Sequence, residues 1–194
     1  MELALQCRCG ALRGLVSHPA QATRAVCYCR HCQAYARLLG DAASVLDAQG
    51  GTTIVATLPG HVRFTQGADR LACMSLTHKG PLRWFSSCCR TPIANTAREM
   101  KLPYAGLVHT CLRDAGGTLP AAYGPVRAQL NTGSATGPVA HSPWRNLLAM
   151  GRLMRIIGGG RLRGAWRATP FFTAEGEPVA PPQAPPASGP GITV

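Results

Sequence analysis

Acidic residues are scarce in this sequence, with eight Asp and Glu against 20 Lys and Arg and a formal net charge of +12. Such an excess favours anionic partners, for example phosphates, carboxylate-rich small molecules or nucleic acid. No stretch approaches about 18 consecutive apolar residues, which excludes a membrane-spanning helix. The beginning of the chain has neither a basic segment nor a long apolar run, so we expect no signal peptide and a cytoplasmic location.

Common catalytic signatures are also lacking. The sequence contains no recognisable Ser-His-Asp set, no phosphate-binding P-loop and no glycine-rich dinucleotide fingerprint. Any catalytic function must therefore rest on a different group of residues.

What the sequence does have is cysteine. Seven of its nine cysteines fall into three short clusters, which are Cys7-Arg8-Cys9, Cys27-Tyr28-Cys29-Arg30-His31-Cys32 and Cys88-Cys89. Zn²⁺ selects thiols at such spacings, because it takes about four ligands and a short cluster supplies several while ordering little backbone. Seven thiolates are too many for one tetrahedral site and one short of two closed sites. We therefore expect two zinc ions per chain, one with the open position that is typical of catalytic zinc.

Disulfides and buried free thiols are the alternatives to metal binding. A disulfide framework belongs to small secreted proteins, and the number of cysteines here is odd. Bonding the neighbours Cys88 and Cys89 to each other would also require a strained ring. Cys73 and Cys111 each stand alone in an apolar run, as buried strand residues commonly do.

Short apolar and β-branched runs separated by turns fill the first two thirds of the chain. This pattern predicts a compact, mostly β domain over residues 1–135, with one short helix at residues 33–39. The expected strands are residues 3–7, 11–16, 24–27, 52–57, 61–65, 71–76, 82–85 and 106–112.

The composition changes near residue 136. A Gly-, Ser- and Thr-rich linker leads to Ser142-Pro143, which is typical of a helix N-cap followed by proline at the first helical position. Apolar residues then recur at helical spacing, with arginines between them and no acidic residue, until Gly158-Gly159-Gly160 predicts the end of the helix. We expect residues 136–172 to form a linker and a basic amphipathic helix. Residues 173–194, rich in Pro and Ala, are expected to be a disordered tail.

The motifs Cys7-x-Cys9-Gly10, Cys27-x-Cys29-x-x-Cys32 and Cys89-Arg90-Thr91-Pro92-Ile93 occur in an order that resembles the glutathione-dependent formaldehyde-activating enzyme and centromere protein V family. The resemblance covers residues 3–112 and implies a mostly β fold similar to the Mss4 fold. It implies a structural zinc at the CxC motif and the late cysteines, and a second, glutathione-facing zinc at CxCxxC. The family reaction joins formaldehyde to glutathione, so the resemblance also implies a carbon–sulfur lyase activity.

The late motif departs from the family pattern, which reads Phe-Cys-x-x-Cys-Gly-Thr-Pro-Leu. Here Ser86 replaces the first cysteine, Cys88 is an additional neighbour of Cys89, and Arg90 replaces the glycine. This Cys-Cys-Arg-Thr-Pro run is typical of a divergent bacterial branch. The fourth ligand beside Cys7, Cys9 and Cys89 is then Cys88, Cys73 from a neighbouring strand, or water. We favour Cys88, because it requires no long-range rearrangement.

An open three-thiolate zinc at Cys27, Cys29 and Cys32 can bind an incoming thiol and lower its pKa. That chemistry suits the joining or release of a thiol–aldehyde adduct, with Arg30 and Arg37 as candidates to receive the carboxylates of glutathione or a similar thiol. His31 lies between two of the cysteines and is expected to face solvent or support the ligands.

The competing interpretation is a non-catalytic binding module in which zinc only stabilises the β domain. Its basic C-terminal helix would then contact nucleic acid, an anionic surface or a protein partner. The sequence leaves open whether the protein is an enzyme.

Overall fold

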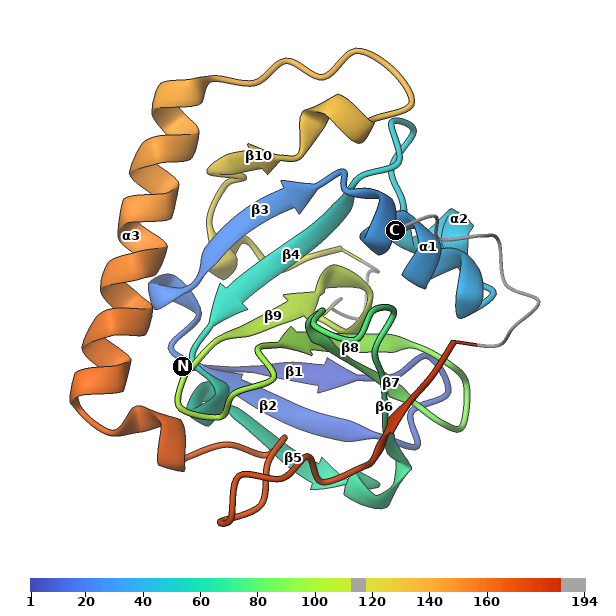
Figure 1. Ribbon diagram of the computed structural model, residues 1–194, viewed down its shortest axis with the longest axis vertical. Helices are drawn as coiled ribbons and strands as arrows, with labels where there is room; N and C mark the ends of the chain where they lie inside the picture. Colours follow the sequence, from blue (N-terminus) through green and yellow to red (C-terminus); the bar gives the residue numbers. More distant parts are fainter. Residues whose placement is uncertain (113–117, 186–194) are drawn as a thin grey trace.

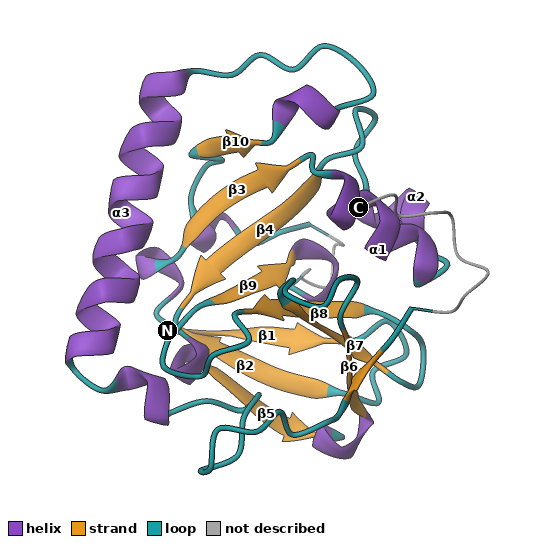
Figure 2. Ribbon diagram, in the orientation of Figure 1, coloured by secondary structure: helices purple, strands orange, loops and turns teal. Residues whose placement is uncertain are grey.

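The computed structural model describes residues 1–112 and 118–185. Within these residues the chain forms two β-sheets and three α-helices, which confirms the prediction of a mostly β protein (Figures 1 and 2). The helices are α1 (Arg30–Leu38), α2 (Ala42–Val45) and α3 (Pro143–Leu162). In the described part of the chain, none of them is long and apolar enough to cross a membrane.

A small antiparallel sheet has the strand order β1-β2-β5, with bounds Glu2–Gln6, Arg13–Ser17 and Val62–Gln66. The larger sheet has the order β10-β3-β4-β9-β8-β7-β6-β11, antiparallel except for its two edge strands, which pair in parallel. Its strands are β3 (Thr23–Cys27), β4 (Thr52–Thr57), β6 (Leu71–Met74), β7 (Leu82–Ser86), β8 (Pro92–Thr96), β9 (Ala105–Val108), β10 (Ala128–Leu130) and β11 (Pro182–Gln183).

The main core lies between the two sheets. Leu5 and Val16 of the small sheet pack in one cluster with Trp84, Ile93 and Leu107 of the large sheet, and all five are at most 1% exposed. Burial of this apolar surface is the main favourable contribution to folding. The two sheets are therefore layers of one domain.

Most strands lie close to their expected positions, and β4 has the expected bounds. The segments that were not expected are α2, β8, β10 and β11. In β8, all five residues are buried, including Asn95 and Thr96. A strand buried on both faces has no polar–apolar alternation for sequence reasoning to detect.

The chain beyond residue 135 returns to the main core. Phe171 is fully buried, with its ring 5.9 Å from Phe64 and 5.3 Å from Trp84 between centroids. In Figure 1, α3 runs along one side of the large sheet beside β10 and β3. Residues 136–172 are thus packed against the β domain at both the helix and the segment that follows it.

Residues 173–185 differ from the disordered tail that the composition predicts. Phe172 and Pro178 form a β-bridge, and β11 pairs with the edge strand β6. The Ser75 N–H donates to Gln183 O at 3.1 Å. The edge of β6 offers backbone groups that even a proline-rich segment can pair with, since Pro is tolerated at the first residue of an edge strand. Residues 186–194 of the predicted tail lie outside the described residues.

Helix α3 begins as expected but ends later. The Ser142 hydroxyl accepts from the Arg145 N–H, and Pro143 is the first helical residue. The helix then continues through the glycines to Leu162. A Cβ at Gly160 would lie 2.7 Å from Leu58 Cδ2. Glycine thus permits a close approach of α3 to the domain here. The helix ends before Gly164, which has φ +69° and supplies the left-handed residue of a C-terminal cap.

We predict that Phe171→Ala destabilises the whole domain by about 3–5 kcal/mol, because it removes a buried ring from the main core. Urea unfolding followed by tryptophan fluorescence measures this change. The exposed Met154→Ala on α3 is the matched control and should change stability by less than about 0.5 kcal/mol. Equal stability of the two variants would show that the C-terminal segment is not part of the core.

Candidate metal centres

Four cysteines from distant parts of the chain meet at one point, which we call the first cluster: Cys7, Cys9, Cys88 and Cys89. Their sulfur atoms all lie within 4.8 Å of one another. The Sγ–Sγ distances are 3.6 Å for Cys7–Cys9, 3.4 Å for Cys9–Cys88, and 4.0 Å for Cys88–Cys89. Four sulfurs about 2.3 Å from one ion stand about 3.8 Å apart in a tetrahedron. The cluster therefore has the donor atoms and the dimensions of a tetrahedral metal site.

Two turns deliver these cysteines. Cys7 follows β1, and the chain reverses at Gly10, whose φ of +74° suits glycine. The turn between β7 and β8 carries Cys88 and Cys89, and it is closed by Arg90 with φ +56°. A left-handed arginine is unusual. Its side chain compensates by donating from Nη2 to Leu38 O at the end of α1, at 2.5 Å.

Hydrogen bonds prepare Cys89 to act as a thiolate. Burial alone would raise the pKa of Cys89, but contacts from the Ser86 hydroxyl at 3.3 Å and the Thr91 hydroxyl at 3.1 Å lower that pKa to about 5. Ser86 Oγ accepts from the Thr91 N–H, so its own proton is available for the sulfur. Ser86 thus supports a neighbouring thiolate although it stands where the resembled family has a cysteine.

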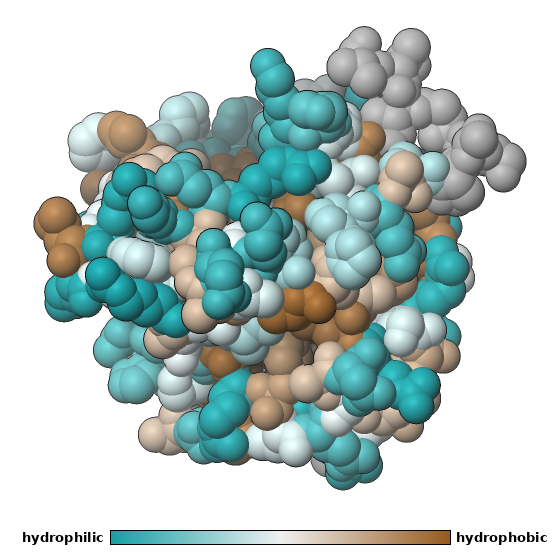
Figure 3. Space-filling model, turned by 60° about the horizontal axis from the view of Figure 1, so that its bottom comes forward, coloured by the Kyte–Doolittle hydropathy of each residue, from teal (hydrophilic) through white to brown (hydrophobic). Residues whose placement is uncertain are grey.

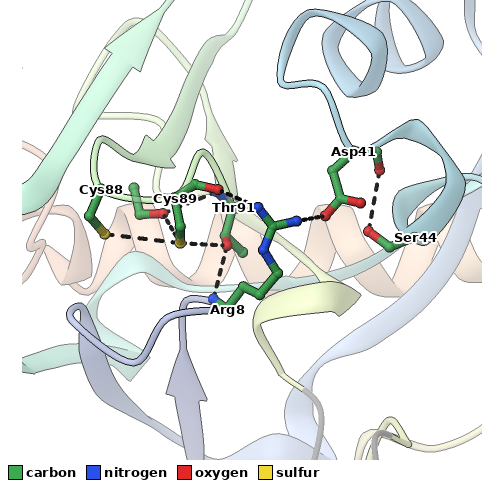
Figure 4. Close-up of polar contacts among 7 residues, drawn as sticks. Arg8, Asp41, Ser44, Cys88, Cys89 and Thr91 are labelled. Carbon is green, nitrogen blue, oxygen red and sulfur yellow. Dashed lines mark hydrogen bonds and ion pairs between the residues drawn. The ribbon is translucent and has the colours of Figure 1, made fainter.

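Arg8 connects the first cluster to the segment that leads into α2 (Figure 4). Its Nη1 forms an ion pair with Asp41 at 2.9 Å, and its Nη2 donates to Cys89 O at 3.2 Å. The Arg8 backbone N–H donates to Thr91 Oγ1. The ion pair is largely exposed and contributes little by itself. Together with the two hydrogen bonds of Arg8, it links the start of α2 to the cysteine loops.

The two solitary cysteines belong to neither cluster. Cys73 on β6 and Cys111 are fully buried in the main core. Burial raises the pKa of Cys73 to about 12, which disfavours its thiolate. The arrangement thus brings Cys88, and not Cys73, to Cys7 and Cys9.

Cys27, Cys29 and Cys32 form the second cluster, and their sulfur atoms also lie within 4.8 Å of one another. Cys27 ends β3, and Cys29 is the N-cap of α1, where its Sγ accepts from the Cys32 N–H at 3.4 Å. Asn131, in the loop after β10, donates to Cys27 Sγ at 3.4 Å. In the described chain, no fourth metal-ligating side chain joins this group.

The surroundings of the second cluster favour a thiolate at Cys29. Hydrogen bonds from Cys27 and Cys32, the Cys32 backbone N–H and the charge of Arg83 lower the pKa of Cys29. The bond to Cys29 raises the pKa of Cys27, and the bonds to both neighbours together with burial raise that of Cys32. A thiolate at a helix N-terminus beside a guanidinium is well placed to bind a metal ion.

A cavity of about 230 Å³ opens onto the second cluster. Small and apolar side chains of β3, β4, β10 and α3 line most of it, and its polar lining comes from Thr23, the cysteines, Arg83, Asn95 and Tyr104. Gly106 on β9 leaves room for the Tyr104 phenol, because a Cβ there would collide with the Tyr104 hydroxyl. The second cluster therefore adjoins a largely apolar cavity that is partly open to solvent.

Arg83 is the cation of this cavity. It is only 4% exposed, and its Nη1 donates to Asn95 Oδ1 at 3.0 Å and lies 3.9 Å from Cys32 Sγ. Its guanidinium also lies over the Tyr35 ring, 5.1 Å from the centroid. Sequence reasoning missed Arg83 and Asn131. An arginine inside the apolar run Leu82-Arg83-Trp84-Phe85 was a signal that could have identified the first of them.

The two arginines that were expected at the second cluster lie outside its cavity. Arg30 and Arg37 are exposed on α1 and do not line the cavity, and Arg37 Nη2 donates to Gln33 Oε1 at 3.2 Å. His31 is also exposed. These three residues face solvent near the cluster. On the cavity side, the cation beside the cluster is Arg83.

Comparison with known proteins identifies the family. The model of a family of unknown function, DUF6151, matches residues 2–182. The chain belongs to the DUF6151 family. No match was found among curated proteins. A crystal structure of a Rhodobacter sphaeroides protein is 19% identical, with 66% of this chain and 100% of that chain covered and a TM-score of 0.42. The resemblance to the formaldehyde-activating enzymes rests on the cysteine motifs alone.

We predict that Cys88→Ser lowers the metal content of the purified protein as much as Cys89→Ser does, because both sulfurs belong to the first cluster. Cys73→Ala should keep the full metal content, since its sulfur lies in the core. Elemental analysis of the three variants measures this. Loss of metal from Cys73→Ala alone would mean that the fourth ligand comes from β6.

Proposed function

We propose that this DUF6151 protein is a two-zinc protein in which the first cluster is structural and the second cluster is the reactive site. Four thiolates saturate a tetrahedral zinc, whereas three leave one position for an external ligand. The tetrahedral spacing of the first cluster supports the structural role. The observation that carries the reactive role is a three-cysteine cluster placed at an apolar cavity with a buried cation.

The proposed reaction class is the joining or release of a thiol and an aldehyde, as in carbon–sulfur lyases. When bound there, zinc would lower the pKa of a captured thiol and hold it as a thiolate nucleophile. Cys27, Cys29 and Cys32 supply the ligands, and Asn131 and the Cys32 N–H stabilise their negative charge. Arg83 partly offsets the charge of the three thiolates.

The cysteine motif order supports two finer proposals. One is an Mss4-like arrangement with the reaction type of S-hydroxymethylglutathione formation. The other is that glutathione or a similar thiol is the cofactor, with its carboxylates held by the exposed Arg30 and Arg37. Because those two arginines lie on α1, which begins at Cys29, a thiol held by them would approach the cluster from the solvent side.

We predict that Cys29→Ser leaves a folded protein with one zinc fewer, because the second cluster orders only one short segment. Zinc X-ray absorption should show an added sulfur at about 2.3 Å when glutathione is given to the wild type, and no such change in Cys29→Ser.

The control is Cys73→Ala, which should respond to glutathione as the wild type does. A wild-type spectrum that glutathione leaves unchanged, although two zinc ions are bound, would contradict thiol capture at this cluster. The protein would then be better explained as a binding module.

One observation favours that second function. Helix α3 carries five apolar side chains that are each more than half exposed, which are Trp144, Leu147, Leu148, Met154 and Leu162. Apolar residues are visible in Figure 3 at the left edge, where α3 lies, among hydrophilic ones. Exposed arginines, including Arg145 and Arg155, accompany them without any acidic residue in the helix. Binding of the whole protein to DNA or anionic vesicles that weakens with salt would support this function.

A further inference from the structure

The cavity beside the second cluster is shaped by strand alternation. Thr23, Ala25 and Cys27 lie on the same face of β3, because successive side chains point to opposite sides of a sheet. Ile54 and Ala56 of β4 continue this floor, and Ala149, Met150 and Leu153 of α3 form the opposite wall. Alanines at these positions leave space between sheet and helix that larger side chains would fill.

Arg83 lines this space and has donors that the protein leaves unused. In the described residues, its Nε–H has no hydrogen-bond partner and only its Nη1 donates to an oxygen. The guanidinium cannot easily turn away, because Asn95 binds its Nη1 and Tyr35 lies against its face. A buried donor without an acceptor is costly. An acceptor oxygen on a ligand that reaches the edge of the guanidinium would lower that cost.

The charge balance around Arg83 determines whether the ligand oxygen should be charged or neutral. A zinc ion with three thiolates carries a net charge of about −1, which the single charge of Arg83 balances. No carboxylate in residues 1–112 or 118–185 forms an ion pair with Arg83, so no further charge enters the balance. A ligand with its own carboxylate would add an uncompensated charge to an apolar cavity, which is costly. A neutral carbonyl oxygen accepts the hydrogen bond without that cost.

The volume of the cavity limits the size of the rest of the ligand. A volume of about 230 Å³ holds roughly eight groups the size of a water molecule, each taking about 30 Å³ in the liquid. Formaldehyde would leave most of this space empty. Glutathione, a tripeptide with two carboxylates and an ammonium group, is too large and too charged to be enclosed in it.

We propose that the cavity binds a small apolar aldehyde or related carbonyl compound, with its chain between the sheet and α3 and its oxygen at the Arg83 guanidinium. This inference rests on the proposed function, because it names the aldehyde half of the thiol–aldehyde pair. When the thiolate attacks, the carbon–sulfur bond forms and the carbonyl π electrons move to the oxygen. The Arg83 guanidinium stabilises that oxygen until it takes up the proton released by the thiol. The reverse reaction returns thiol and aldehyde.

The test uses hexanamide as an unreactive carbonyl probe, with formamide and hexanoate for comparison. Isothermal titration calorimetry on the purified zinc-loaded protein should show binding of hexanamide. We expect formamide and hexanoate each to bind at least about tenfold more weakly, the first because it lacks the chain and the second because of its charge.

Neighbouring positions on α3 offer a matched pair of variants. Leu153→Phe enlarges a side chain that lines the cavity, whereas Met154→Phe enlarges one on the exposed face. Only Leu153→Phe should weaken hexanamide binding, by at least about tenfold. Arg83→Lys tests the hydrogen bond with the positive charge kept, and should lose affinity for hexanamide to a similar degree.

Equal hexanamide binding by Leu153→Phe and Met154→Phe would show that the cavity is not the binding site. Tighter binding of hexanoate than of hexanamide would show that the site does not select a neutral carbonyl group. Measuring zinc content and hexanamide binding in Cys29→Ser separates the two proposals. Binding that persists after loss of the second zinc supports the cavity site independently of thiol capture. Absence of binding in a wild type that does take up glutathione sulfur at zinc would refute the cavity site alone.

Discussion

The constraint on which the rest of the structure depends is the meeting of four cysteine sulfurs at the first cluster. Thiolates this close repel one another unless a cation neutralises them, so the cluster requires a metal ion to be stable in its charged form. The cluster joins the β1–β2 turn to the β7–β8 turn, and two arginines extend that junction to α1. Arg90 binds the end of this helix and Arg8 binds Asp41 just beyond it. Since Cys29 and Cys32 lie at the start of α1, this helix runs from the second cluster to the contacts around the first.

The two clusters differ in what surrounds them, and this difference supports a division of roles. At the first, hydroxyl groups of Ser86 and Thr91 and a complete set of four sulfurs leave nothing for a ligand to supply. At the second, three sulfurs adjoin a cavity that is lined by Arg83, a buried cation with an unpartnered donor. Unsatisfied groups are costly, and they tend to persist where a ligand completes them. The chemistry is therefore to be sought at the second cluster.

Sequence reasoning reached the features that depend on local spacing. The three cysteine motifs, strand β4 and the N-cap at Ser142 follow from residue types a few positions apart. Features that depend on tertiary packing could not be predicted from the sequence. The glycines near Gly160 suggest a helix end, but in the fold they admit a close contact with Leu58. Nothing local shows that Phe171 enters the core between the sheets. Arg83 acquires its role only because the sheet brings β7 beside α1 and the cysteines.

The central claim is that seven cysteines hold two metal ions of different kinds. Mass spectrometry of the intact chain tests it most directly, because the native mass counts the bound ions and the mass after denaturation distinguishes reduced cysteines from disulfides. The account predicts a main species with two zinc ions per chain, and a metal-free species after denaturation in which all cysteines are reduced. A species with no zinc and with masses lowered by the hydrogens lost to disulfides would contradict it.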